Sequence, residues 1–141
     1  MSDGASEPGH DARREELLGA SRGLAALLGI EMTVVGPDRV VARMEVTPDH
    51  LQPFGILHGG ANLVLAETVA SVGAYLAAGP GKSAFGMEIN ANHLRAVRSG
   101  VVEAEGTPIH LGTTTQVWEV EIRDAEGRLT CVSRCTLAVR G

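Results

Sequence analysis

A segment of the chain, QPFGILHGGANLVLAETVAS (residues 52–71), places one acid in a long apolar run. Glu67 is the only ionisable side chain between His58 and Lys82 apart from Tyr75, a phenol that stays neutral near pH 7. Burying a carboxylate without a partner costs several kcal/mol, so an acid at this position needs an explanation. A structural ion pair or a protonated, hydrogen-bonded carboxyl group is one explanation, and a reactive acid is the other.

The neighbours of Glu67 favour the reactive acid. Ser71 follows four residues later, one helical turn along the same face, where its hydroxyl can reach the carboxylate or a water bound to it. Upstream, His58, Gly59 and Gly60 lie where the chain enters the helix, so backbone N–H groups and the positive end of the helix dipole point at one place. Such a place binds a developing oxyanion, and Gln52 can add a neutral donor. An acid with oxyanion donors predicts hydrolysis of an activated acyl group, with Glu67 as general base or nucleophile.

The spacing of these groups predicts that two chains share each site. Gly59 and Glu67 are eight residues apart, which is about 12 Å along one helix. The two residues of one chain therefore cannot contact the same carbonyl group. If two central helices lie antiparallel across a twofold axis near Leu63, Gly59 of one chain meets Glu67 of the other. We expect a homodimer with two shared sites.

The elements around this segment predict an α+β fold. Leucines at three-, four- and seven-residue steps predict an amphipathic helix over residues 11–29, and EMTVV and RVVARMEVT about GPD predict a β-hairpin. The apolar run predicts a long central helix from about Gly60 to Ala78. Three or four antiparallel strands follow, of which the last two are joined at DAEG. Helices then lie on one side of an antiparallel sheet.

Length and charge exclude several function classes. With 141 residues the chain is long enough for one domain, which we place at residues 11–141 after a disordered leader at residues 1–10. The net charge of −5 and the absence of Lys/Arg clusters beyond a pair argue against a nucleic-acid partner. The polar N-terminus lacks the apolar core of a secretory signal, so we expect a cytoplasmic protein. Polar residues interrupt the central helix, so we expect no membrane span.

The remaining core candidates are two thiols and an indole. Cys131 and Cys135 lie four residues apart on a predicted strand, hence about 13 Å apart, which is too far for a disulfide. We expect both to be reduced and partly buried. Trp118 alternates with Val120 and Ile122, which predicts packing in the core.

The motif QPFGILHGGA followed by LAETVAS resembles the active-site region of the hotdog-fold acyl-CoA thioesterases. The resemblance covers most of the chain after residue 11 and implies an antiparallel sheet wrapped around a long central helix. It also implies dimers that pair these helices, assembled further into tetramers as dimers of dimers. The similarity is greatest to enzymes acting on aromatic acyl-CoA, namely dihydroxynaphthoyl-CoA thioesterase of menaquinone synthesis, the enterobactin proofreading thioesterase, hydroxybenzoyl-CoA thioesterase and the phenylacetate-pathway thioesterase. The implied reaction converts acyl-CoA to free acid and CoA, with CoA as part of the substrate and no other cofactor.

This resemblance implies a role for each residue of the motif. Glu67 becomes the catalytic acid. The Gly59 amide and Gln52 bind or polarise the thioester, and His58 assists near its oxygen. Ser71 positions water or the carboxylate. In the family, the residues matching Gln52, His58 and Gly59 come from one subunit and those matching Glu67 and Ser71 from its partner, which agrees with the distance argument.

Two further segments, MEINANHLR and PIHLG, resemble the places where the family binds CoA. Arg95 is the natural phosphate ligand among them. Relatives often carry Arg just after HLG, whereas this chain has three threonines, a loss of charge that weakens nucleotide recognition. The CoA-contacting residues implied by the resemblance are Gly86, His93, Leu94, Arg95, Ala96, His110, Leu111, Gly112, Thr113, Thr114 and Thr115.

Other interpretations fit the residues less well. His93 and His110 have no carboxylate at a supporting spacing, so we predict no metal site. A hotdog hydratase or dehydratase would carry a different separation of acid and histidine. A non-catalytic acyl-CoA sensor would not need an acid facing the thioester. We expect His50 and Arg13 to be solvated.

Overall fold

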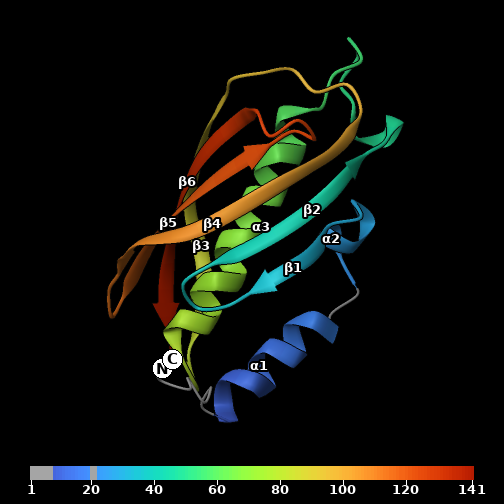
Figure 1. Ribbon diagram of the computed structural model, residues 1–141. Helices are drawn as coiled ribbons and strands as arrows, with labels where there is room; N and C mark the ends of the chain where they lie inside the picture. The colour runs from blue at the N-terminus through green and yellow to red at the C-terminus, as the bar shows by residue number, and fades with distance from the viewer. Residues whose placement is uncertain (1–7, 20–21) are drawn as a thin grey trace, which may run out of the picture.

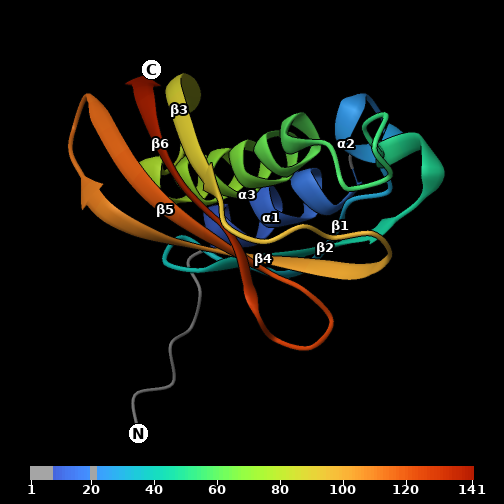
Figure 2. The same cartoon turned by 90° about the horizontal axis from the view of Figure 1, so that it is seen from above.

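In the computed structural model of the chain, one long helix lies against the concave face of a six-stranded antiparallel sheet, as Figures 1 and 2 show. The structure describes residues 8–19 and 22–141. The strand order is β1-β2-β4-β5-β6-β3. The elements are α1 (Pro8–Gly19), α2 (Leu24–Leu27), β1 (Glu31–Val35), β2 (Val40–Val46), the short 3₁₀ helix η1 (Pro48–His50), α3 (Gly59–Ala78), β3 (Ser83–His93), β4 (Gly100–Leu111), β5 (Thr115–Arg123) and β6 (Leu129–Arg140).

The sheet forms because apolar and polar residues alternate along its strands. In β2 the side chains of Ala42, Met44 and Val46 are buried, whereas Arg43 and Glu45 between them are exposed. The same period of two recurs in β4 and β5 and in the first part of β6. Strands with this pattern bury one face, and α3 covers that face. The predicted α+β class, the hairpin and the central helix are confirmed, with the helix beginning one residue earlier than expected.

Close contact between α3 and the sheet depends on a glycine in the helix. A Cβ atom added at Gly73 would overlap the ring of Trp118, which is fully buried. The indole is also fixed by polar contacts, because its Nε1 donates to Gln116 Oε1 at 2.8 Å and Gln116 Nε2 donates to the carbonyl of Ala74 at 3.2 Å. Trp118 is thus a core residue, as predicted, and it fixes the distance between helix and sheet.

We expect Gly73→Ala to destabilise the protein by up to about 2 kcal/mol. Alanine is better than glycine in a helix by about 1 kcal/mol, but overpacking against an immobile ring costs about 1–3 kcal/mol. The measurement is guanidinium unfolding followed by circular dichroism. A gain in stability would show that the indole can move aside.

The N-terminal region differs from its prediction. The helix expected over residues 11–29 is two helices, α1 and α2, and α1 begins at Pro8, inside the expected leader. Gly23, the N-cap residue of α2, has φ 85, a conformation that favours glycine and that a continuous helix does not allow. The leucine pattern therefore spans two separate helices, and Leu24 and Leu27 are exposed rather than packed. Residues 1–7 of the expected leader lie outside the described residues.

Two residues expected to be solvated are not. His50 is 6% exposed, and its Nδ1 accepts the backbone N–H of Thr47 at 3.1 Å as part of a capping box. Arg13 is half-buried, with its guanidinium 3.6 Å from the centre of the Tyr75 ring and donating to the carbonyl of Tyr75 at 2.7 Å. Both predictions were wrong because each contact depends on the tertiary fold or a local cap. The Arg13 contact fastens α1 to the end of α3.

The two cysteines are free and fully buried on the core side of β6. Burial raises the pKa of Cys131 to about 11. Burial, followed by the charges of Glu67 and Glu88, raises the pKa of Cys135 to about 12. Both thiols were expected to be only partly buried, so the structure places them deeper than predicted.

These pKa values predict thiol chemistry and alkaline stability. A thiol reagent at pH 8 should leave the native protein unlabelled and react with both cysteines in guanidinium, since the thiolate is the reactive form. The unfolded chain loses its thiol protons at lower pH than the folded chain, so the thiols' contribution to stability is full below about pH 8.5. That contribution should fall as the pH rises towards 11 and 12. Rapid native labelling at pH 8 would contradict the buried placement.

The length and composition of α3 would also suit a membrane span. In its most apolar window, however, 56% of the residues are buried inside the fold. The sheet and the shorter helices contact this helix, as seen from above in Figure 2. The protein core therefore accounts for its apolar composition.

Candidate active site

The loop before α3 presents the amide of Gln52. The loop is held by an isolated bridge between Leu51 and Leu57 and by a turn in which Gly55, with φ 82, donates to the carbonyl of Gln52 at 3.0 Å. The side-chain oxygen of Gln52 accepts the backbone N–H of Phe54. Because its oxygen is occupied, Gln52 has its NH₂ group as the end available to a ligand.

His58 caps the first turn of α3. Its Nδ1 accepts the N–H of Gly60 at 2.8 Å, so in the neutral ring Nε2 carries the proton. The carbonyl of His58 accepts the N–H of Ala61 at 2.9 Å. The N–H of Gly59 is the first in the helix and has no intrahelical acceptor. This leaves it as a backbone donor at the positive end of the helix.

A pocket of about 320 Å³ lies at this end of α3. It joins the loop and the helix start to the segment that follows β3. Its lining is made of Gln52, Ile56, Leu57, Gly59, Asn62, His93, Leu94, Arg95, Ala96 and Val97. The structure thus brings Gln52 and Gly59 together with His93–Ala96, the first of the expected CoA segments.

Asn62 is the polar residue of this pocket that the sequence analysis did not assign to a site. It is only 5% exposed and lies on the same helix face as Gly59, three residues earlier. Its Nδ2 lies 3.2 Å from Nδ1 of His93. An asparagine in the first turn of an otherwise apolar helix was the available signal.

Glu67 lies two turns further along α3, next to the edge of the sheet. It is half-buried, and a Cβ atom added at Gly86 in β3 would overlap its Oε1 atom. Within the part of the chain that the structure describes, its carboxylate forms no ion pair or hydrogen bond. A structural ion pair among the described residues of one chain is therefore not the reason for this acid. Ser71, also half-buried, follows one turn later.

We expect Gly86→Ala to lower kcat by about 100-fold, since a displacement of about 1 Å at a reacting group can cost that much. The new methyl group must displace the Glu67 carboxylate, which is the mobile end of a flexible side chain. The fold should therefore keep its stability within about 1 kcal/mol. Steady-state kinetics and thermal unfolding check both expectations, with Asn92→Ala on the same strand as control. Unchanged kcat would separate Gly86 from the site.

The expected site residues form two groups along α3, one at its first turn and one that begins near its middle at Glu67. Gly59 and Glu67 lie on one uninterrupted helix, about 12 Å apart. Figure 1 shows the β3–β4 connection beside the start of α3 and the β4–β5 hairpin towards its other end. The second expected CoA segment, His110–Thr115, lies in that hairpin, where the carbonyl of Thr114 accepts the N–H of Val139 at 2.9 Å. The structure therefore does not unite the expected residues within one chain.

The positions of the histidines bear on the metal prediction. His93 pairs with Cys131, whereas His110 pairs through Val117 with Thr136, five residues further along β6. Five strand residues correspond to about 16 Å, so these histidines of one chain cannot bind the same ion. Among the described residues, no group of three His, Cys, Asp or Glu is arranged to hold a metal.

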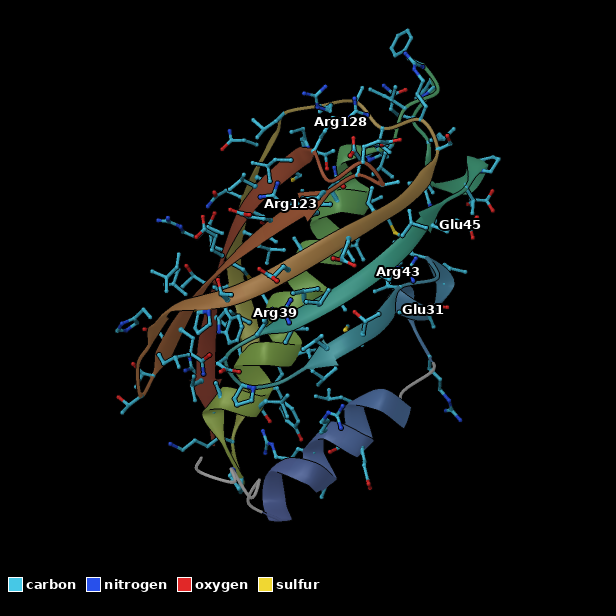
Figure 3. All side chains as sticks on the ribbon, viewed as in Figure 1. Glu31, Arg39, Arg43, Glu45, Arg123 and Arg128 are labelled. Carbon is cyan, nitrogen blue, oxygen red and sulfur yellow. The ribbon has the colours of Figure 1, made fainter. Side chains whose placement is uncertain are left out.

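A larger groove of about 740 Å³ lies between α2 and the sheet edge. Its lining includes the exposed Leu24 and Leu27 and the charged Glu31, Arg43 and Glu45, and the last three are labelled in Figure 3. The groove shares no residue with the pocket at Gly59 or with the Glu67 group. We therefore place the chemistry at α3 rather than in the larger groove.

Comparisons with known proteins agree with this architecture. The family model described as Thioesterase superfamily matches residues 54–131. The chain is 48% identical over 118 residues to 1,4-dihydroxy-2-naphthoyl-CoA hydrolase of Listeria monocytogenes, covering 84% of this chain and 96% of that one. It is 47% identical over 114 residues to proofreading thioesterase EntH of Cronobacter turicensis, covering 81% and 83%. The crystal structure of a thioesterase from Haemophilus influenzae superposes with a TM-score of 0.84 at 43% identity, covering 96% and 92%.

The match spans the motif segment, α3 and most of the sheet, and the overall agreement in structure extends to nearly the whole chain. The sheet wrapped around a long helix is the hotdog fold that the motif implied. The chain belongs to the thioesterase superfamily and is a thioester hydrolase of hotdog fold.

Proposed function

We propose that the protein hydrolyses an aromatic acyl-CoA at sites shared by two subunits, with Glu67 as the reacting acid. The half-buried, unpaired Glu67 carboxylate against Gly86 carries the proposal, because nothing else in the described residues explains an acid there. The preference for an aromatic acyl group is supported by the similarity of the chain to one relative, the 1,4-dihydroxy-2-naphthoyl-CoA hydrolase of Listeria monocytogenes.

The proposed chemistry divides the work between the two groups of residues. Gln52 Nε2, the Gly59 N–H and His58 polarise the thioester carbonyl and stabilise the oxyanion that forms there. Glu67 either removes a proton from the attacking water or attacks the carbonyl carbon itself. When Glu67 acts as general base, water adds to the carbonyl carbon, the carbon–sulfur bond breaks, and the free acid leaves. When Glu67 attacks, the carbon–sulfur bond breaks to leave a mixed anhydride with Glu67, which a water molecule then hydrolyses to the free acid and the original carboxylate. In both routes the thiolate of CoA takes up a proton. Ser71 positions the water or the carboxylate.

The open edge of the sheet supports a dimer. β3 is an edge strand, and its Phe85 and Met87 are 60% and 55% exposed. An unpaired edge with apolar side chains is a template for association with a second copy. A twofold axis near Leu63 would bring Gly59 of the partner subunit to Glu67 and complete two sites. Exposed Leu24 and Leu27, away from this edge, support the further pairing of dimers into a tetramer.

The same symmetry would unite the two CoA segments. Arg95 lies exposed beside the pocket at the start of α3, where its guanidinium can bind a phosphate. Thr113, Thr114 and Thr115 lie in the hairpin near the other end, so they would come from the partner subunit. Three hydroxyl groups supply hydrogen bonds without charge, which makes Arg95 the main phosphate ligand.

A panel of thioesters tests the proposed reaction. Hydrolysis of benzoyl-, phenylacetyl-, dihydroxynaphthoyl- and octanoyl-CoA is followed by release of the CoA thiol, and kcat/KM is compared. We expect at least one aryl ester to exceed octanoyl-CoA by about tenfold or more, as pocket fit discriminates to that extent. Preference for octanoyl-CoA would overturn the aryl assignment. Hydration of an enoyl-CoA without thiol release would overturn hydrolysis.

A further inference from the structure

Asn62 has contacts that the proposed mechanism leaves unexplained. Its side chain is more than nine-tenths buried and lines the pocket at Gly59. Nδ2 lies 3.2 Å from Nδ1 of His93, whereas the buried Oδ1 has no hydrogen-bond partner among the described residues. A buried amide oxygen without a hydrogen-bond partner costs free energy, so an asparagine at this position points to a role beyond packing.

The other nitrogen of His93 lies over Gly59. Nε2 is 2.8 Å from the place that a Cβ atom of residue 59 would occupy. Only glycine at position 59 therefore leaves room for the imidazole. The ring then lies beside the Gly59 N–H group, which we propose binds the carbonyl oxygen of the thioester. His93 is exposed, so its Nε2 can reach a ligand in the pocket.

The orientation of the Asn62 amide determines which ring nitrogen carries the proton. An amide NH₂ group can only donate, so Nδ1 of His93 must accept and the proton of the neutral ring lies on Nε2. If the amide were turned by half a rotation, Oδ1 would face His93 and the NH₂ group would take the buried place that has no partner. Two buried N–H donors would then lack acceptors. Orphaned N–H donors are rarer in proteins than an under-satisfied carbonyl oxygen, so the observed orientation is favoured.

We propose that Asn62 is a positioning residue that holds His93 as the Nε2–H tautomer, so that His93 donates to the thioester carbonyl oxygen beside the Gly59 amide. The proposal rests on the proposed function of this pocket. It gives His93 a part in the reaction in addition to the CoA contact implied by the family resemblance. The donor acts most strongly as negative charge develops on the oxygen, so it lowers the barrier more than it tightens binding.

Nitrogen-15 NMR of the histidine rings tests the tautomer without any assay of activity. At pH 8 we expect the His93 ring of the wild-type protein to be the Nε2–H form, assigned by comparison with His93→Gln. Asn62→Leu, which keeps the size but removes the donor, should give a mixture of both tautomers. A wild-type ring with its proton on Nδ1 would overturn the proposal. Because this result does not depend on Glu67 or on turnover, it is distinguishable from a failure of the proposed hydrolysis.

Kinetics of Asn62→Asp test the donor role. A carboxylate at position 62 can only accept, so it binds Nδ1–H and stabilises the imidazolium, which still donates from Nε2. When that ring loses a proton at higher pH, the Nε2 proton is the one lost, and a lone pair then faces the oxyanion. We expect kcat of Asn62→Asp to fall at alkaline pH by about 100-fold relative to wild type, the usual effect of losing one oxyanion donor. KM should stay within a few fold.

The wild-type protein and a double variant serve as controls. His58, at the N-cap of α3, and Arg95, in the pocket lining, are present in both proteins, so only the residue at position 62 differs between the two pH profiles. Asn62→Leu should lower kcat by about tenfold in the wild-type background, and should have no further effect in a His93→Phe background. An Asn62→Asp profile parallel to wild type, or an equal Asn62→Leu loss in both backgrounds, would reduce Asn62 to a packing residue.

Discussion

Replacing Glu67 with alanine is expected to lower kcat by about 10³-fold or more, in the upper range for loss of a general base. In the proposed mechanism the carboxylate acts on the reacting carbonyl, whereas we expect the nucleotide to bind at Arg95 and the hairpin threonines. Binding of the CoA ester should therefore change only a few fold. Glu67→Gln should fail similarly, because an amide keeps the shape but neither takes up a proton nor attacks. Binding is measured with a thioether analogue, which cannot be hydrolysed.

A charge control accompanies this pair of variants. Glu126 lies exposed in the turn between β5 and β6, where it contacts Arg128. Glu126→Gln removes the same charge at a residue that does not line the pocket at Gly59 and should leave kcat unchanged. Near-normal turnover in Glu67→Ala would remove Glu67 from the mechanism. It would also remove the proposed role of Gly86, which is to leave room for the Glu67 carboxylate.

Activity is expected to return when two inactive variants are mixed. Glu67→Ala and Gln52→Ala each damage both sites of their own homodimer. If subunits exchange at random, about half of the dimers are mixed, and in each of these one site has both lesions while the other has none. About a quarter of the wild-type activity should therefore appear under twofold symmetry.

The control mixes two variants with lesions in the same half of the site, Glu67→Ala and Gly86→Ala. Every site of a mixed dimer then contains one lesion, so no activity should return. Subunit exchange is verified by mass spectrometry of differently tagged chains. Failure of Glu67→Ala and Gln52→Ala to complement one another, despite proven exchange, would place each site within one chain.

Local pattern was sufficient for the main elements of the fold. The apolar run predicted α3 to within one residue at its start, and alternation predicted the buried face of β2. The motif at residues 52–71 predicted the acid and the donors, and these roles stay predictions. Helix geometry alone predicted that Gly59 and Glu67 lie too far apart in one chain, and the uninterrupted α3 agrees.

Contacts between distant residues were not predictable in this way. Asn62 and His93 are 31 residues apart, and Arg13 and Tyr75 are 62 apart, so no periodicity relates them. The leucine spacing continued past the end of α1 at Gly19, although Gly23, the N-cap residue of α2, has a backbone conformation that no continuous helix allows. His50 was misplaced for another reason, since a capping histidine looks in sequence like any polar loop residue.

The chain contains a single tryptophan, and the structure buries it between α3 and the sheet. Its emission should therefore lie at short wavelength and shift to the red when α3 leaves the sheet, with no second indole to mask the change. The ring lies against Gly73, which follows Glu67 by six residues on α3 and is not part of the pocket at Gly59. Fluorescence can thus report helix docking separately from substrate binding, and a site variant that loses turnover but keeps the native emission has lost chemistry rather than fold.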